Sequence, residues 1–194
     1  MSTNPFAGWR PPLPSPLAGA GFVHALVDVG EGVTLSVVQG PRRGRPPLLL
    51  LPAQMGTWHS WALVLEPLSA AFDVDVIELR GHGASTWTTG RYDWNTVAGD
   101  VVRYIEAVVQ RPAFIAGNSS GGIVALWCAA NAPEAVAGIV LEDAPVFSVE
   151  WPRFRDRDRF VFNGLVAIAD ALGDVEHRNL ADLFKYLASR QVFE

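Results

Sequence analysis

The sequence is poor in cysteine and in charge, and it lacks a long uninterrupted apolar run. Its one cysteine, Cys128, cannot form an internal disulfide, so we expect a reducing compartment, the cytoplasm. Charged residues make up only 18% of the 194 residues, and the net charge of −5 argues against a nucleic-acid partner, which would need a clustered basic face. No stretch approaches the roughly 18 uncharged apolar residues of a membrane-spanning helix. The proline-rich start does not resemble a signal peptide. We therefore expect a soluble protein that binds neither nucleic acid nor membrane.

Three kinds of ligand motif are also missing. The sequence contains no metal-ligand cluster, no phosphate-binding loop and no dinucleotide fingerprint. We therefore expect no metal and no cofactor, and a small-molecule substrate as the main partner.

Hydrophobic residues are plentiful, at 49%, which is enough for one sizeable core. The first 21 residues form a leader in which Pro11, Pro12, Pro14 and Pro16 predict an extended, non-helical chain. Residues 22–147 are then expected to form the core domain.

Strand patterns of two kinds follow the leader. Residues 22–29 and 33–38 are β-rich runs separated by Gly30-Glu31-Gly32, which predicts an antiparallel hairpin. Short apolar runs without alternation are typical of central parallel strands buried on both faces. Four such runs occur, at residues 48–51, 74–79, 113–116 and 138–141.

Helical patterns separate these strands, at residues 58–71, 94–110 and 120–131. In the second, Val97, Val101 and Ile105 recur at helical spacing, Asp93 is placed to cap the start, and Asp100 is expected to face away from the core. The third is apolar almost all round and predicts a buried helix. The alternation predicts an α/β fold with a doubly wound, mostly parallel sheet. Residues 148–194 hold two helical patterns with no strand between them, which predicts the start of a helical cap.

The strongest motif is Gly117-Asn118-Ser119-Ser120-Gly121, between a predicted strand and a predicted helix. Such a turn is a nucleophile elbow, in which small residues two before and two after the serine avoid backbone clashes. Centring the motif on Ser119 places glycine on both sides, so Ser119 is the better nucleophile. Chance would give roughly 0.1 such matches in a chain of this length, so the motif alone is suggestive. A plain glycine-rich turn between a strand and a helix is the alternative.

With the elbow, several segments in the same order make residues 22–145 resemble the cap-bearing, serine-hydrolase branch of the α/β-hydrolase superfamily. Residues 48–56 resemble its oxyanion-hole strand and loop, residues 78–85 its Arg-Gly-His-Gly turn, residues 92–100 the stretch opening the helix before the elbow, and residues 140–145 the strand end before the cap.

The resemblance assigns roles to individual residues. It implies oxyanion-hole amides from Gln54 and Ser120, although Pro52-Ala53 stands where the family usually has His-Gly. It implies a structural role for His82 in its turn. Asp143 is a candidate acid, at a strand end where a minority of the family keep it; an ordinary polar residue is the alternative there.

Aromatic residues near the expected site have two interpretations. Trp58, His59 and Trp151 lie in segments expected to line a substrate pocket. The tryptophans are equally well explained as core residues, and His59 as an ordinary histidine at a helix end.

No histidine occupies the position of the family's catalytic base, which follows its last strand. We therefore expect the chain to be the N-terminal part of a longer hydrolase, inactive alone, and prone to self-association or to pairing with the missing C-terminal part.

The leading hypothesis is a serine hydrolase that cleaves a small apolar ester or lactone through an acyl-serine. Carbon–carbon bond hydrolysis and perhydrolysis use similar sites and stay open. A non-catalytic receptor on the same scaffold and an interaction domain are the alternatives from other classes. Branches that attack epoxides or alkyl halides are disfavoured, because they resemble this architecture with aspartate at the elbow.

Overall fold

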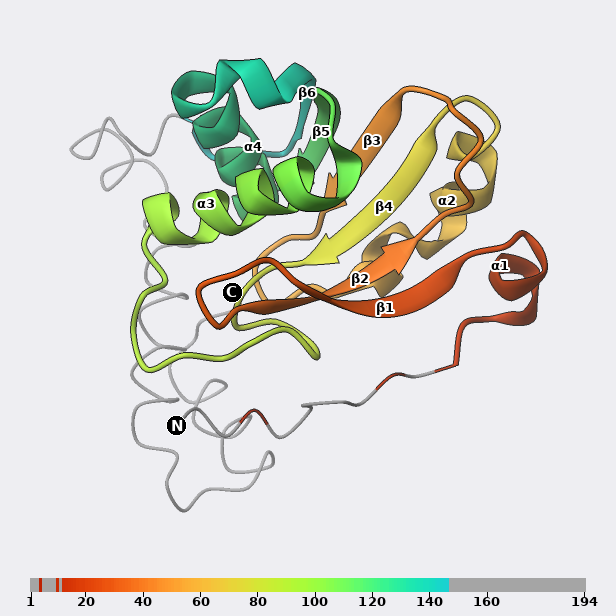
Figure 1. Ribbon diagram of the computed structural model, residues 1–194, viewed down its shortest axis with the longest axis horizontal. Coiled ribbons are helices and arrows are strands. Elements are labelled where there is room, and N and C mark those ends of the chain that lie inside the picture. The colour runs from red at the N-terminus through yellow and green to blue at the C-terminus, as the bar shows by residue number, and fades with distance from the viewer. Residues whose placement is uncertain (1–3, 5–9, 11, 147–194) are drawn as a thin grey trace, which may run out of the picture. The chain divides into compact units, whose positions relative to one another are not determined.

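The computed structural model describes Asn4, Arg10 and residues 12–146 (Figure 1). The chain divides into two compact units, Met1–Pro145 and Val146–Glu194, and every element described below belongs to the first. The expected cap at residues 148–194, including Trp151, lies outside the described residues and stays a prediction.

A six-stranded sheet with the order β1-β2-β4-β3-β5-β6 forms the centre of the first unit. The hairpin β1–β2 is antiparallel and β2 pairs antiparallel with β4, whereas β3, β4, β5 and β6 run parallel to one another. The strands are β1 Val23–Asp28, β2 Thr34–Gln39, β3 Pro47–Leu51, β4 Asp73–Glu78, β5 Ala113–Asn118 and β6 Val136–Glu142. The predicted doubly wound, mostly parallel sheet with an antiparallel hairpin is confirmed.

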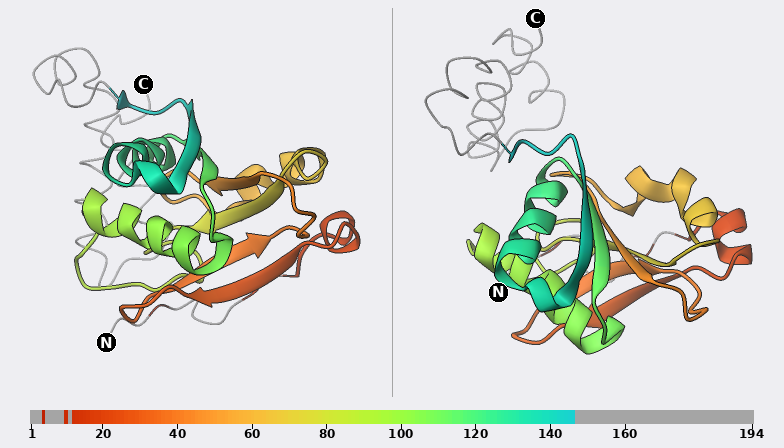
Figure 2. Two further views of the ribbon diagram at one scale, coloured as in Figure 1. Left: turned by 45° about the horizontal axis from the view of Figure 1, so that its top comes forward. Right: turned by 90° about the horizontal axis from the view of Figure 1, so that it is seen from above.

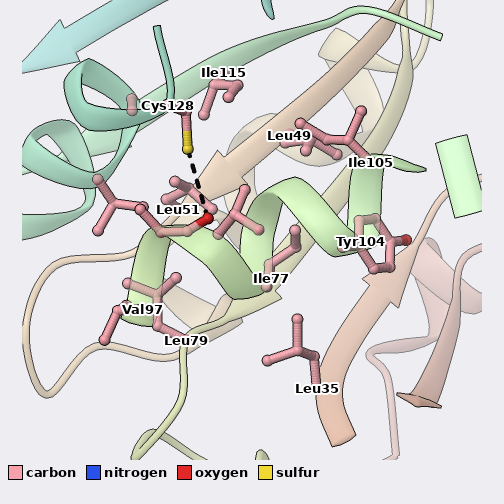
Figure 3. Close-up of a cluster of buried hydrophobic side chains, with 14 of the residues drawn as sticks. Leu35, Leu49, Leu51, Ile77, Leu79, Val97, Tyr104, Ile105, Ile115 and Cys128 are labelled. Atoms are coloured by element: carbon pink, nitrogen blue, oxygen red, sulfur yellow. Dashed lines mark hydrogen bonds between the residues drawn. The ribbon is translucent and has the colours of Figure 1, made fainter. Parts of the chain in front are cut away.

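Helices cover both faces of this sheet, with α3 and α4 on one side and α1 and α2 on the other (Figure 2). The helices are α1 Ser15–Gly19, α2 Ala62–Leu68, α3 Trp94–Tyr104 and α4 Ser120–Asn131. Successive residues of β3 point to opposite faces. Leu49 and Leu51 pack in the cluster with α3 and α4 (Figure 3), whereas Leu48 and Leu50 pack in the cluster with α1 and α2. Because β3 is buried along its whole length, its continuous apolar run is explained. Strand β4 is buried as completely, but Asp73, Asp75 and Glu78 interrupt its apolar residues.

The leader is partly helical, so the prediction that residues 1–21 contain no helix is wrong. Helix α1 spans Ser15–Gly19, with Pro16 in its first turn. Proline is tolerated there because the first N–H groups of a helix have no acceptor inside the helix and the fixed φ suits helical backbone. Leu17 then packs into the core on the α2 side of the sheet.

Two predicted helices change geometry along their length. The segment after β3 begins as a 3-10 turn, η1 Trp58–Trp61, and continues as α2. Helix α3 passes into a π-helical turn, η2 Ile105–Val109, which ends where Gln110 adopts a left-handed conformation. Its predicted cap is confirmed, because the Asp93 carboxylate accepts the Thr96 N–H at 3.0 Å.

Asp100 faces the interior, so its expected solvent position is wrong. Its two carboxylate oxygens accept from Arg80 Nε at 2.8 Å and from an Arg80 terminal nitrogen at 2.7 Å, and both side chains are 1% exposed. Arg103 on the next turn of α3 also contacts Asp100. The hydrogen bonds to Asp100 raise the pKa of Arg80, although burial opposes this. The pair therefore holds the turn after β4 against α3.

Helix α4 and strand β6 are less buried than predicted. Only one side of α4 is buried, and Leu126 on its other side is exposed. Strand β6 is an edge strand of the described sheet, paired only with β5, and Val140 is 59% exposed. The expectation that the run at residues 138–141 is a central strand is therefore wrong for the described residues. An apolar run alone does not distinguish an edge from the middle of a sheet.

The beginning of the chain contacts the turn after β4. The Asn4 side-chain amide donates to the Ser85 carbonyl at 2.7 Å and to the Gly83 carbonyl at 3.3 Å. A residue near the start of the leader thus binds at the end of the parallel strands where their carboxyl termini lie.

Candidate active site

The turn between β5 and α4 has the backbone of a nucleophile elbow. Ser119 is the single residue between the end of β5 and the start of α4, with φ 51° and ψ −116°. A positive φ is costly for any residue with a Cβ and persists only where the surrounding structure enforces it. The strained residue is Ser119 and not Ser120, which supports the choice of Ser119 as nucleophile.

The glycines on either side of Ser119 are required by close backbone contacts. A Cβ on Gly117 would lie 2.2 Å from the carbonyl carbon of Gly121. A Cβ on Gly121 would lie 2.4 Å from the Leu51 carbonyl oxygen and 2.7 Å from that of Pro52. The elbow is therefore packed directly against the end of β3.

The expected oxyanion-hole residues follow neighbouring strand ends. Strands β3 and β5 are parallel neighbours with Leu51 opposite Gly117, so Gln54 follows one strand end and Ser120 the other. Ser120 is the first residue of α4, and the first N–H groups of a helix have no acceptor within it and a partial positive charge. Gln54 lies in an exposed turn, closed by a 2.8 Å hydrogen bond from the Gly56 N–H to the Ala53 carbonyl. Both roles remain predictions.

The same turn contains Met55, which is 68% exposed and has a φ of 61°. Glycine is usual at such a position. The turn thus presents a strained, exposed methionine next to Gln54.

Asp143 lies immediately beyond β6, beside the elbow. The carbonyl of the preceding Glu142 accepts the Ser119 N–H at 2.8 Å, and Ala144 packs against Gly122 at the start of α4. Asp143 itself is exposed, and its side chain makes no hydrogen bond to the described residues. Its role as the acid therefore stays a prediction.

The three histidines in the described part of the chain are each engaged away from Ser119. His24 Nε2 lies 2.7 Å from Ser36 Oγ, and His59 Nδ1 lies 3.0 Å from Thr57 Oγ1. His82 Nδ1 lies 3.1 Å from the Arg80 carbonyl, within its own turn, as expected for a structural histidine. No hydrogen bond within the described residues joins any of them to the Ser119 hydroxyl.

Trp58 and His59, both predicted to line a substrate pocket, differ in their exposure to solvent. Trp58 is 1% exposed and packs in the cluster with α2, which is the placement expected of a core residue. Its indole stacks on the exposed His59 ring with centroids 3.7 Å apart. Within the described chain, His59 alone of the three predicted pocket residues reaches solvent.

Cys128 is excluded as a competing nucleophile by its surroundings. It is buried in α4, and its thiol faces the Ala98 carbonyl of α3 at 3.8 Å (Figure 3). Burial raises the pKa of Cys128 to about 12, so the thiol stays protonated at neutral pH.

Sequence reasoning missed the role of Glu78. Glu78 is the last residue of β4, and its buried carboxylate accepts backbone N–H groups from two separate loops. Both loops lie at the carboxyl ends of the parallel strands, as Ser119 does. The available signal was a run of acidic residues, Asp73, Asp75 and Glu78, alternating with apolar residues in a strand predicted to be buried.

The described residues contain neither a metal-binding cluster nor a membrane-spanning helix. No group of three histidine, cysteine or acidic side chains there is arranged to hold a metal ion. No helix in that part of the chain has the length and apolarity needed to cross a membrane.

Parts of this chain are similar to known proteins in sequence or in structure. The chain is 36% identical over 95 residues to the magnesium-chelatase 30 kDa subunit of Rhodobacter capsulatus, covering 48% of this chain and 33% of that protein. It is 30% identical over 134 residues to 2-(acetamidomethylene)succinate hydrolase of Mesorhizobium japonicum, covering 66% of this chain and 45% of that protein. The crystal structure of Cfl2 from Burkholderia cenocepacia matches with a TM-score of 0.61 at 25% identity, covering 87% of this chain and 65% of that one.

The chain covers only part of each curated relative, whereas the family model covers most of the chain. The chain spans between 26% and 57% of the length of the curated relatives compared with it. A family model described as alpha/beta hydrolase fold matches residues 46–174, well over half of the chain. With its sheet order and its elbow, the chain belongs to the α/β-hydrolase fold family.

Proposed function

We propose that this chain carries the nucleophile of a serine hydrolase that cleaves a small apolar ester or lactone. The observation that carries the proposal is the backbone of Ser119, held at φ 51° between the end of β5 and the start of α4. A serine forced into this conformation presents its hydroxyl at the end of the sheet, where a substrate can reach it. The 2-(acetamidomethylene)succinate hydrolase among the relatives supports hydrolysis as the class of reaction.

The proposed reaction needs a nucleophile, a base, oxyanion donors and an acid that orients the base. The Ser119 oxygen attacks the substrate carbonyl carbon and passes its proton to a base that lies outside the described residues. The N–H groups of Gln54 and Ser120 donate to the oxyanion that forms. The oxyanion then re-forms the carbonyl, the carbon–oxygen bond to the leaving group breaks, and the protonated base gives its proton to the leaving oxygen. The acyl-serine that remains is hydrolysed by water. Asp143 is the proposed acid that orients the base.

Replacing Ser119 with alanine should abolish covalent labelling by a fluorophosphonate probe. The probe reacts with an activated serine oxygen, which alanine lacks. The test uses protein expressed from the intact gene, with labelling followed by intact-mass spectrometry. Ser120→Ala is the matched control, because its proposed contribution is a backbone N–H that alanine keeps; it should retain labelling within a few fold.

Failure to label would favour the alternative function. A folded wild-type protein that the probe leaves unlabelled would contradict the hydrolase proposal and support a binding protein on the same scaffold. Pro52-Ala53 before Gln54 motivates that alternative, because it replaces the family's usual pair in the oxyanion loop. Labelling that persists in Ser119→Ala would show instead that another residue is the nucleophile.

We also propose that the chain self-associates through β6. Edge strands that present apolar side chains tend to pair with other chains, and Val140 is exposed on β6, beyond the register irregularity at the start of this strand. We expect the weight-average mass in sedimentation equilibrium to rise with concentration, and Val140→Lys to keep the chain monomeric. Leu63→Lys, at an exposed residue of α2, is the control and should leave association unchanged. A monomeric wild-type chain at all concentrations would contradict the proposal.

The proposed location is the cytoplasm. It rests on the single, buried cysteine, which is typical of proteins in a reducing compartment.

A further inference from the structure

Glu78 is a buried carboxylate at the carboxyl end of β4, 3% exposed, and it forms no ion pair within the described residues. One of its oxygens accepts the Trp58 N–H at 3.4 Å and the other accepts the Ala84 N–H at 3.2 Å. We propose that Glu78 is a positioning residue, which fixes the loop carrying Gln54 by binding it to the turn at residues 81–85. This inference rests on the proposed function, because it assigns a purpose to the loop that presents Gln54.

On one side, Glu78 caps the helical segment that follows the Gln54 loop. Trp58 is the first residue of η1, so its N–H has no acceptor within the helix. Thr57 precedes it but makes no capping bond, because its hydroxyl pairs with His59. The Glu78 carboxylate supplies the missing acceptor from another strand, and its negative charge suits a helix start.

On the other side, Glu78 is enclosed by the turn after its own strand. A Cβ on Gly83 would lie 2.0 Å from a Glu78 carboxylate oxygen, so the turn passes directly against the carboxylate. The Ser85 hydroxyl donates to the Glu78 carbonyl at 2.6 Å. Both the side chain and the backbone of Glu78 thus hold this turn.

The Gln54 loop is fixed at three points, and Glu78 makes the last of them. Its start lies at the end of β3, where the Leu51 and Pro52 carbonyls pack against Gly121. Its middle is closed by the turn from Ala53 to Gly56. Its end is held through the Trp58 N–H. Release of that end would free the Gln54 N–H to turn away from the substrate.

The chemistry of the two contacts requires a carboxylate. Two N–H donors converge on one side chain, and an ionised carboxylate has two acceptor oxygens and no donor. Glutamine has the same shape, but its NH₂ group would face one of the two N–H groups. Aspartate keeps the negative charge, but its side chain is one methylene shorter. Its carboxylate would therefore lie farther from both the Trp58 and the Ala84 N–H groups.

The test compares Glu78→Gln and Glu78→Asp with wild type by amide hydrogen exchange and by fluorophosphonate labelling of Ser119. In Glu78→Gln we expect exchange at Trp58 or Ala84 to speed up at least tenfold, while the core amides of Ile77 and Ile115 keep their wild-type rates. We expect labelling of both variants to slow at least tenfold. The control Glu66→Gln, at an exposed glutamate of α2, should match wild type in both measurements.

The outcomes distinguish failure of the positioning role of Glu78 from failure of the hydrolase proposal. Wild-type exchange at both amides in Glu78→Gln, or faster exchange with unchanged labelling, would overturn the positioning role. If neither variant folds, rapid exchange of the Trp58 and Ala84 amides in wild type overturns it, and protection of both supports it. If wild type is not labelled at all, the hydrolase proposal fails while the exchange rates still decide whether Glu78 fixes the loop.

Discussion

Gly121→Ala should eliminate fluorophosphonate labelling of Ser119 and lower the free energy of unfolding by about 2–3 kcal/mol. The added Cβ would lie 2.4 Å from the Leu51 carbonyl oxygen and 2.7 Å from that of Pro52, and both are backbone atoms that no rotamer change can move. The start of α4 and the end of β3 must therefore separate. Since Ser119 precedes that helix start and Gln54 follows that strand end, the separation changes the geometry of both at once. Urea unfolding and intact-mass labelling measure the two effects.

A glycine in α3 provides the matched control for this change. A Cβ on Gly99 would meet only the end of the flexible Arg103 side chain, at 3.6 Å. Alanine is the better helix former by roughly 0.5–1 kcal/mol, so Gly99→Ala should stabilise the protein and leave labelling unchanged. Equal effects of the two substitutions would contradict the close contact at Gly121.

Asp100→Asn should lower the free energy of unfolding by about 3–5 kcal/mol, because it leaves the Arg80 guanidinium buried without a counter-charge. Both side chains are 1% exposed, so water cannot replace the lost carboxylate. The measurement is urea unfolding at neutral pH. Glu106→Gln, at an exposed carboxylate of η2, is the control and should change stability by less than about 0.5 kcal/mol.

A double substitution separates the loss of the partner from the loss of the pair. Replacing both residues with apolar side chains of similar size, Arg80→Met with Asp100→Leu, removes the unpaired charge as well as the attraction. Such replacements are often neutral or stabilising, so the double variant should be more stable than Asp100→Asn alone. A double variant less stable than Asp100→Asn would show that the lost hydrogen bonds, and not the unpaired buried charge, account for most of the loss in stability.

The parts of the fold that follow from local patterns were predictable from the sequence. The run at residues 48–51 is apolar because β3 lies in the middle of the sheet with helices on both faces. The elbow was recognisable because its residues are contiguous in the sequence; Gly117 is required by a contact inside the turn, with Gly121, although Gly121 itself is required by the carbonyls at the end of β3. Local sequence carries such information directly.

The features that depend on distant partners were not predictable in the same way. The position of Asp100 in the helical pattern is that of a solvent-facing residue. It can be buried because Arg80, just after β4, donates to both of its carboxylate oxygens. Glu78 acquires its role from N–H groups of Trp58 and Ala84, which the folded backbone brings to it. The exposure of β6 depends on which strands lie beside it, and the apolar composition of a strand does not identify those neighbours.

The contact between Asn4 and the turn after β4 affects how the protein should be handled. The Asn4 amide binds the Gly83 and Ser85 carbonyls, on either side of the Ala84 N–H that Glu78 holds. An affinity tag or fusion partner attached at the N-terminus would therefore be tethered beside the residues that shape the proposed active site. Trimming the leader back to Pro12 would remove that contact and leave two carbonyls to water. Asn4 should therefore be kept, and any N-terminal tag released, before activity is measured.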